Sequence, residues 1–197
     1  MRGLQRFVNA CHERGIAVLL DVVYNHLGPS DLGIWRFDGW SQGEWGGIYF
    51  YNDDRGATPW GNTRPDFGRN EVREYLVESA TYFLNDMHID GLRVDGTAWI
   101  RRTGADLGGE DVQDNPDGWS WLQYLNNSVD GQSPEKIIVA EDGYNEWAMT
   151  RPTSQGGAGF DSQWDPNFHW PVRNAIEADN DNDRNMWALH DAVNFAY

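Results

Sequence analysis

The feature that most constrains the fold is a set of short apolar runs that alternate with helical patterns. The first run, Ile16–Val23, is interrupted only by Asp21, and further runs follow at His88–Val94, Ile137–Ala140 and, more weakly, Gly159–Trp164. A nearly continuous apolar run is typical of a strand buried on both faces, as in parallel sheets. Connections of this length between strands must be crossovers, so we predict a parallel α/β protein.

Helical spacing fills the intervals between these runs. A first helix precedes Gly15, with apolar residues at Leu4, Phe7, Val8 and Cys11. We predict further helices from a cap at Asn70 to about Met87, from about Gly118 to Val129, and from about Phe168 onward. The buried stripe of the second helix should be Val72, Tyr75, Leu76, Ala80, Phe83 and Leu84.

Three other segments lack a clear period. Residues 27–69 are rich in Gly, Asp, Trp and Pro, which predicts a long loop or small subdomain, and loops of this length are usually functional. Residues 96–118 are expected to be irregular. The charged run at 179–184 should break the last helix as a solvated turn.

A doubly wound sheet is the main alternative to a barrel. Such a sheet would normally carry a Gly-rich phosphate loop after its first strand. Here that strand is followed by Tyr-Asn-His-Leu-Gly, and the segment Gly156–Gly159 precedes a strand and lacks the third glycine of the dinucleotide fingerprint. A barrel-type sheet therefore fits better.

Ionisable residues cluster at the strand ends. Asp21 is followed by His26, Asp95 comes two residues after Arg93, and Glu141 follows the run at 137–140. Each acid alone could cap a helix or accept loop amides. In a β/α barrel, however, the carboxyl ends of the strands line the active site, so together they predict a catalytic pocket.

Two converging carboxylates without Cys or clustered His suggest chemistry on an acetal. At about 5 Å apart, one carboxylate can attack the anomeric carbon while the other protonates the leaving oxygen, with retention of stereochemistry. Partial burial in an aromatic-rich pocket would keep the acid protonated. Arg93 and Asp95 project from the same strand face, where the guanidinium would keep Asp95 ionised.

Composition excludes several other classes of protein. The chain has 15 Lys and Arg against 31 Asp and Glu, a net charge of −16, which argues against nucleic-acid binding. No apolar run is long enough for a membrane helix. The single cysteine, Cys11, excludes an internal disulfide and a Cys-built zinc site. With no secretory signal at the N-terminus, we expect a cytoplasmic protein.

The chain also has eleven tryptophans. Core packing must account for most of them. Several nevertheless fall in polar, Gly-rich segments, where flat rings suit stacking on sugars: Trp35, Trp40, Trp45, Trp60, Trp119 and Trp121.

The ordered motifs resemble those of the α-amylase superfamily (glycoside hydrolase family 13). The segment 21–26 (DVVYNH) resembles the first motif of that family, 91–95 (GLRVD) the second, and 139–141 (VAE) the third. Residues 64–67 (RPDF) are similar to the short motif in the loop after its third strand. The resemblance covers essentially the whole chain. It implies a partial (β/α)8 TIM barrel, about strands 3 to 6, with 27–69 as a loop subdomain and 1–197 as a fragment of one catalytic barrel.

The resemblance also implies a role for each matched residue. Asp95 would be the nucleophile and Glu141 the general acid/base. Arg93 would position the nucleophile, His26 would contact the sugar, and Asp21 and Asn25 would support the base of the site. No cofactor is implied, and the substrate would be an α-1,4-glucan or maltooligosaccharide.

Within the superfamily, three segments look like branching enzymes and maltooligosyltrehalose trehalohydrolases: 21–30, the TPWG at 58–61, and 156–165. We therefore favour a transferase that cuts an α-1,4-glucan and reattaches it through an α-1,6 bond. A hydrolase of the amylase or trehalohydrolase type is the second hypothesis. An inactive glucan-binding relative is the third.

Two departures from the family pattern bear on function. Gly96 and Trp99 follow the nucleophile where small-residue and polar patterns are commoner, which affects subsite preference. The family also needs a third catalytic Asp, preceded by His, on a seventh strand. His190-Asp191 has the right dipeptide but reads as helix, so we expect this motif beyond Tyr197. An isolated half barrel should then have little glucan activity and could self-associate through its exposed edges.

No metal site is predicted. The remaining histidines lack metal-ligand spacing: His12, His88, His169 and His190. Some amylases bind calcium through an Asn of the first motif and loop acids. The loop here offers only Asp31, Asp38, Asp53 and Asp54, without a recognisable site.

Overall fold

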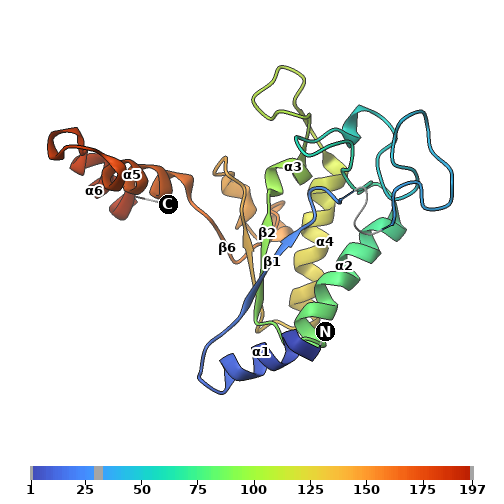
Figure 1. The fold of residues 1–197 in the computed structure, drawn as a ribbon, viewed down its shortest axis with the longest axis horizontal. Coiled ribbons are helices and arrows are strands. Elements are labelled where there is room, and N and C mark those ends of the chain that lie inside the picture. The colour runs from blue at the N-terminus through green and yellow to red at the C-terminus, as the bar shows by residue number, and fades with distance from the viewer. Residues whose placement is uncertain (1, 29–32, 196–197) are drawn as a thin grey trace.

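The computed structural model describes residues 2–28 and 33–195. Its centre is a parallel sheet with strand order β1-β2-β5-β6 (Figure 1). The strands are β1 (Leu19–Val23), β2 (Gly91–Asp95), β5 (Ile137–Ala140) and β6 (Ser162–Gln163). Neighbours in the sheet come in chain order and pair in parallel, so the predicted parallel α/β architecture is confirmed.

Helices cover one face of this sheet. Helix α2 (Asn70–Asn85) and helix α4 (Pro116–Gln132) lie side by side along it, and α1 (Arg2–His12) lies near the amino end of β1 (Figure 1). One hydrophobic core joins α2, α4 and the even-numbered strand positions; it includes Leu76, Leu84, Leu92, Val94, Trp121, Leu125, Ile138 and Ala140. This core fixes the strands that carry the carboxylates.

The opposite face of the sheet is open. Leu19, Val23 and Ile137 are 48%, 44% and 48% exposed, whereas Val22 is 7% exposed. The prediction of a strand over Ile16–Val23 buried on both faces is therefore wrong, because helices cover only one side and the strand begins at Leu19. Ile137, in the run 137–140 that was predicted to be a buried strand, is exposed because its side chain also lies on the uncovered face.

Several predicted boundaries also shift. The strand predicted at 88–94 begins at Gly91, and His88 has a left-handed backbone (φ 56°), which lies outside the β region. The N-cap position of α2 is Arg69 rather than Asn70, without a side-chain capping hydrogen bond, and the helix ends at Asn85. Tyr75, placed in its buried stripe, is 40% exposed. The strand predicted over 159–164 contracts to Ser162–Gln163.

The long loop is confirmed as largely irregular and is fastened by one buried arginine. Within the described part, it contains only the short helix η1 (Asp54–Gly56) and isolated bridges. The Arg64 side chain is fully buried and donates to four backbone carbonyls: Arg55 (2.6 Å), Ala57 (2.7 Å), Arg102 (2.7 Å) and Gly104 (3.2 Å). Arg102 and Gly104 belong to the segment after β2, so Arg64 fastens the long loop to the chain at the carboxyl end of that strand.

The segment 96–118 is more regular than predicted. It contains α3 (Thr97–Arg101) and a short antiparallel pair, β3 (Arg102–Thr103) and β4 (Gln113–Asp114). Helix α3 follows β2 almost directly, so its side chains lie at the carboxyl end of the sheet.

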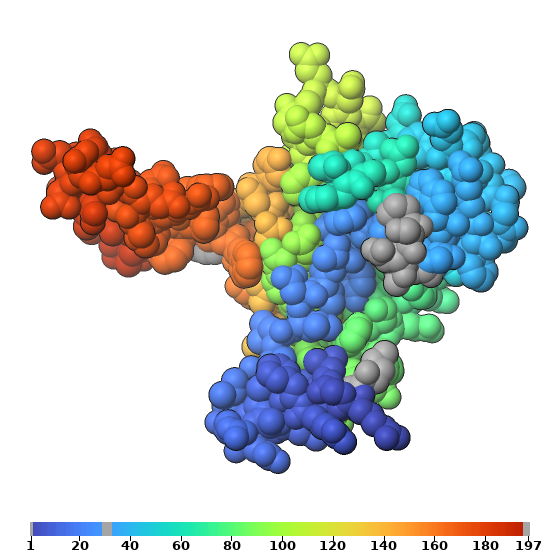
Figure 2. Space-filling view, in the orientation of Figure 1, coloured from blue at the N-terminus to red at the C-terminus, as the bar shows by residue number. Residues whose placement is uncertain are grey.

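The C-terminal region extends from the body as a helical pair. After the short helices η2 (Trp147–Met149) and η3 (Thr153–Gln155), α5 (Pro166–Glu177) packs against α6 (Met186–Phe195), and the pair projects away from the sheet (Figures 1 and 2). The run at 179–184 is an exposed turn containing η4 (Asp181–Asp183), as predicted. Among the described residues, no helix is both long enough and apolar enough to span a membrane.

Candidate active site

The predicted site residues meet at the carboxyl end of the sheet. Strand register aligns Asp21 of β1 with Arg93 of β2, and Val23 with Asp95. Residues two apart share a strand face, so Arg93 and Asp95 point to the same open side. Glu141 directly follows β5, and its backbone N–H donates to the carbonyl of Val94 (2.9 Å). Adjacent parallel strands thus deliver all three acids to one edge.

Arg93 connects these acids. Its Nη1 donates to both carboxylate oxygens of Asp21 (2.7 and 3.0 Å) and to Oδ1 of Asp95 (2.6 Å). Its Nη2 lies 3.7 Å from Oε2 of Glu141. The Arg93 side chain is only 15% exposed, which strengthens these charge-assisted contacts. One guanidinium therefore fixes the relative positions of three carboxylates.

Asn25 and His26 form a second set of contacts to Asp95. The buried Asn25 amide donates to the backbone carbonyl (2.8 Å) and to Oδ2 (3.0 Å) of Asp95. With its NH2 so used, Asn25 presents Oδ1 to Nδ1 of His26 at 2.5 Å. In the neutral imidazole this leaves Nε2 as the free acceptor. The His26 ring also stacks on Trp60, with centroids 4.4 Å apart and planes at 11°.

Burial shifts the pKa values of His26 and Glu141 in opposite directions. Burial lowers the pKa of His26, an effect that the negative charge of Asp95 opposes. Burial raises the pKa of Glu141, and the nearby charges of Asp95 and Asp142 add to it. The Gly96 N–H, which donates to Glu141 Oε2 at 2.8 Å, and Arg93 oppose that rise. Glu141 consequently holds a proton to higher pH than an ordinary glutamate.

The structure explains why glycine follows Asp95. Gly96 has a left-handed backbone (φ 53°), and a Cβ there would lie 2.6 Å from Nδ2 of Asn25. This conformation turns the chain sharply from β2 into α3 and directs the Gly96 N–H at Glu141. A departure from the family pattern thus has a local geometric reason.

Sequence reasoning missed a buried ion pair beside Glu141. Asp142 is fully buried and accepts two bonds from Arg101, at 2.8 and 2.9 Å, and one from the Thr97 hydroxyl at 3.1 Å. The Thr97 N–H also donates to the carbonyl of Glu141 (2.9 Å). This network clamps the end of β5 to α3. The available signal was the second acid directly after Glu141.

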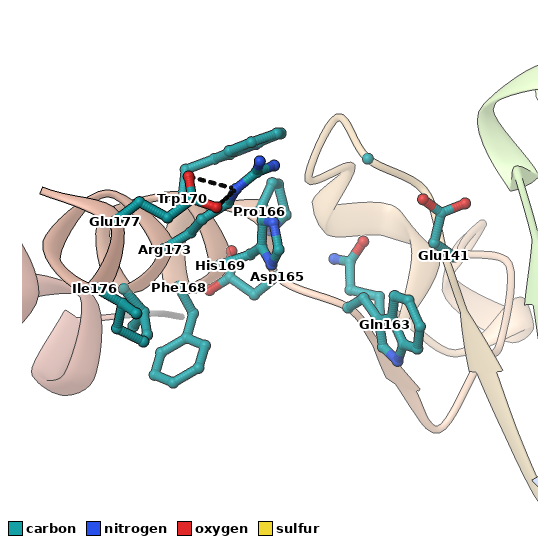
Figure 3. Close-up of a pocket in the computed structure, with 13 residues that line it drawn as sticks. Glu141, Gln163, Asp165, Pro166, Phe168, His169, Trp170, Arg173, Ile176 and Glu177 are labelled. Carbon is teal, nitrogen blue, oxygen red and sulfur yellow. Dashed lines mark hydrogen bonds and ion pairs between the residues drawn. The ribbon is translucent and has the colours of Figure 1, made fainter.

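Sequence reasoning also missed Trp164 and the cavity beside it. The Arg93 guanidinium lies over the Trp164 ring, with its Cζ 4.3 Å from the ring centroid. Next to it is an open cavity of about 800 Å³ between the strand ends and α5. Figure 3 shows Glu141 on the sheet side of this cavity, with Trp170 and Arg173 across from it on α5.

Other sequence candidates lie outside the site. His190 and Asp191 sit on the exposed α6, where they contact each other at 3.1 Å. Of the loop acids considered for calcium, Asp31 lies outside the described residues, and Asp53 instead pairs with Arg55. Within residues 2–28 and 33–195, no group of three or more His, Cys, Asp or Glu side chains is arranged to hold a metal ion.

The fold and the site define a class: consecutive strands of a parallel β/α barrel with acids at their carboxyl ends. Among solved structures, the chain resembles a maltogenic alpha-amylase, AmyB, from Thermotoga neapolitana (TM-score 0.59, 18% identity, 96% of this chain and 37% of that one). It also resembles a Salmonella typhimurium structure assigned to the alpha amylases (TM-score 0.65, 22% identity, 90% of this chain and 27% of that one). These matches confirm the predicted partial TIM barrel.

Three relatives found by sequence are all named for one activity, 1,4-alpha-glucan branching. The chain is 36% identical over 173 residues to the 1,4-alpha-glucan branching enzyme of Hydrogenovibrio crunogenus (83% of this chain, 23% of the relative). It is 38% identical over 176 residues to that of Thiobacillus denitrificans (85% and 23%) and 34% identical over 203 residues to that of Nitrosomonas europaea (97% and 25%). No family model matches the chain.

In fold the chain resembles alpha-amylases, and in sequence it is similar to enzymes named for 1,4-alpha-glucan branching. It spans about a quarter of the length of these relatives.

Proposed function

We propose that this chain supplies the nucleophile and the general acid/base of a retaining enzyme that remodels α-1,4-glucan, with branching as the favoured outcome. The observation that carries the proposal is the contact of one partly buried arginine, Arg93, with both Asp95 and Glu141 at neighbouring strand ends. Paired carboxylates held in this way are the machinery of glycosyl transfer with retention.

The reaction proceeds by two successive nucleophilic displacements at the anomeric carbon. In the first, a carboxylate oxygen of Asp95 attacks the anomeric carbon, the bond from that carbon to the leaving O4 breaks, and Glu141 gives its proton to O4. In the second, Glu141 takes the proton of an acceptor 6-hydroxyl, whose oxygen attacks the same carbon as the bond to Asp95 breaks. The product is an α-1,6 link, and both carboxyl groups return to their starting states.

The contacts suit these roles. Asp95 accepts from Arg93 at Oδ1 and from Asn25 at Oδ2, and these two bonds orient the carboxylate, as a nucleophile requires. The raised pKa of Glu141 suits an acid that must hold a proton near neutrality. A neutral His26 with a free Nε2 is placed to accept a bond from a sugar hydroxyl. Asp21 supports the site by holding Arg93.

Transfer and hydrolysis use the same carboxylates and differ in the acceptor. The similarity to enzymes named for 1,4-alpha-glucan branching favours transfer. A cytoplasmic location and self-association through the edges of the sheet remain predictions.

The test is a chimera in which this chain replaces the matching segment of the Nitrosomonas europaea branching enzyme. We expect amylose to gain α-1,6 anomeric signals by proton NMR. Asp95→Asn or Glu141→Gln should lower that rate by about 10³-fold or more, while Asp183→Asn, on the exposed turn, should not. A folded chimera that Asp95→Asn leaves active would contradict the proposal. New reducing ends without α-1,6 signals would favour the hydrolase.

The purified 197-residue chain provides a second test. Among the described residues, the His-Asp dipeptide at 190–191 lies on α6 and not at a strand end, so we expect this chain to show little or no turnover of amylose. Normal turnover by this chain would refute the fragment hypothesis, and α-1,6 signals among the products would identify a complete branching enzyme.

A further inference from the structure

The buried ion pair between Arg101 and Asp142 connects the two segments that follow the proposed catalytic carboxyl groups. Arg101 belongs to α3, the helix that begins two residues after Asp95. Asp142 is the next residue after Glu141. The pair therefore joins the chain just beyond the proposed nucleophile to the chain just beyond the proposed acid/base.

The Asp142 carboxylate is held by donors on both of its oxygens. Oδ2 accepts from Arg101 Nε (2.8 Å) and from the Thr97 hydroxyl (3.1 Å), and Oδ1 accepts from Arg101 Nη2 (2.9 Å) and from the Tyr144 N–H (3.3 Å). Thr97 and Arg101 are four residues apart, so they lie on one face of α3 and bind the same carboxylate. A two-point contact from a planar guanidinium fixes direction as well as distance.

The position of Glu141 depends on these contacts because Glu141 lies beyond the last residue of β5. Its N–H still pairs with the carbonyl of Val94 on β2. Its own carbonyl, however, accepts from the start of α3: from the Thr97 N–H (2.9 Å) and from the Thr97 hydroxyl (3.2 Å). Its carboxylate accepts from the Gly96 N–H (2.8 Å), directly before that helix. Any movement of α3 against residue 142 would therefore move Glu141.

Stability alone is a weak reason for a buried ion pair. Both charges lose their hydration on burial, and apolar side chains of similar volume are often at least as stabilising. An apolar pair would fill the same space, but it has no directional bonds. The Arg101–Asp142 pair has such bonds, and it has them between the two segments whose relative position matters for the proposed reaction.

We propose that Arg101 and Asp142 are positioning residues, which hold the segment after Glu141 against the segment after Asp95 and so set the separation of the two carboxyl groups. Thr97 supports them through its hydroxyl. This inference rests on the proposed function, because both displacements need the two carboxyl groups at a fixed distance. Arg101, Asp142 and Thr97 take no part in bond breaking. A misplacement of about 1 Å at such a site lowers the rate by about 10²-fold.

The experiment separates position from stability with the double variant Arg101→Met with Asp142→Leu. This variant removes both buried charges, so we expect its urea midpoint to lie close to that of the unaltered chain, whereas Asp142→Asn lowers the midpoint. In the chimera with the Nitrosomonas europaea enzyme, the double variant should still lower kcat by about 10- to 100-fold and change KM by less than about twofold, because no substrate contact is removed. Asp183→Asn, on the exposed turn, is the control and should change neither.

The Gly96 amide reports the position of Glu141 independently of activity. Its proton lies toward Oε2 of Glu141, with N and O 2.8 Å apart, so its chemical shift follows the length of this bond. In the purified 197-residue chain, we expect the Gly96 amide proton signal to move upfield in the double variant as the bond lengthens. Thr97→Val leaves the ion pair intact and should give a smaller shift in the same direction, with a severalfold loss of kcat in the chimera. Thr97→Ser should retain both.

The inference requires both changes in the double variant. A Gly96 signal that stays in place, or a kcat that stays normal, would overturn it, because the pair would then serve stability alone. If the double variant is less stable than expected, Thr97→Val decides in the same way, since it leaves no buried charge without a partner. The proposed function fails separately, if Glu141→Gln leaves the chimera active while the Gly96 signal still responds to the double variant.

Discussion

The buried pair between Arg101 and Asp142 gives the sharpest test of how this site is held together. Asp142 is fully buried and the Arg101 side chain is 6% exposed, so water cannot replace either partner. Removing one partner of such a pair costs about 3–5 kcal/mol, because the other charge stays buried. Glu146 Oε2 lies 3.7 Å from Arg101 Nη1 and compensates part of that charge, which places the expected cost at the lower end of this range. We predict a loss of this size in the free energy of unfolding for Asp142→Asn, which keeps the shape of the side chain and removes its charge.

A matched control is available in the exposed pair between Asp53 and Arg55. Their bonds are equally short, at 2.7 to 3.1 Å, but both side chains are about half exposed. Asp53→Asn keeps an oxygen that can accept from the Arg55 N–H at the start of η1, and it should cost at most about 1 kcal/mol.

The assay is urea unfolding followed by tryptophan fluorescence. For a chain of this size, 1 kcal/mol corresponds to about 2–4 °C in melting temperature, so thermal unfolding provides a check. The double variant Arg101→Met with Asp142→Leu should recover most of the loss, since it removes both buried charges. Equal costs for Asp142→Asn and Asp53→Asn would refute the argument from burial.

Three further predictions concern the elements around the site. Arg64→Met should destabilise the chain by about 3 kcal/mol or more, because four backbone carbonyls lose their buried donor, and protease should then cut the long loop before the helices. Equal rates of loop cleavage in Arg64→Met and in the unaltered chain would contradict this. Gly96→Ala should cost about 1–3 kcal/mol through its left-handed backbone and its clash with Asn25, as measured by urea unfolding, and an unchanged midpoint would argue against it. The pKa of His26, followed by NMR of its ring, should lie below 6.5 and rise toward that value in Trp60→Ala as water reaches the ring. Because the folded state then binds this proton less readily than the unfolded state, His26 should lower stability only as the pH falls below about 6.5, and a value above 6.5 in the unaltered chain would contradict the reasoning.

The fold was largely predictable because hydrophobic pattern and chain order carry it. The apolar runs at 88–94 and 137–140 predicted two of the four strands to within a few residues, and the alternation with helices predicted parallel pairing. The errors arose where a backbone conformation or a neighbouring layer decided the outcome. His88 turns in the left-handed region, and the sheet is covered on one face only.

The candidate site divides in the same way. The sequence by itself determined which residues reach the edge of the sheet, since strand periodicity places Arg93 and Asp95 on one face and parallel order brings Glu141 beside them. Only the tertiary structure decided which groups those residues meet. Trp60 on His26, Trp164 on Arg93, and Arg101 on Asp142 are separated by 34 to 71 positions along the chain. Contacts of this kind depend on how loops and helices pack over the strand ends, and no local pattern of residues encodes that packing.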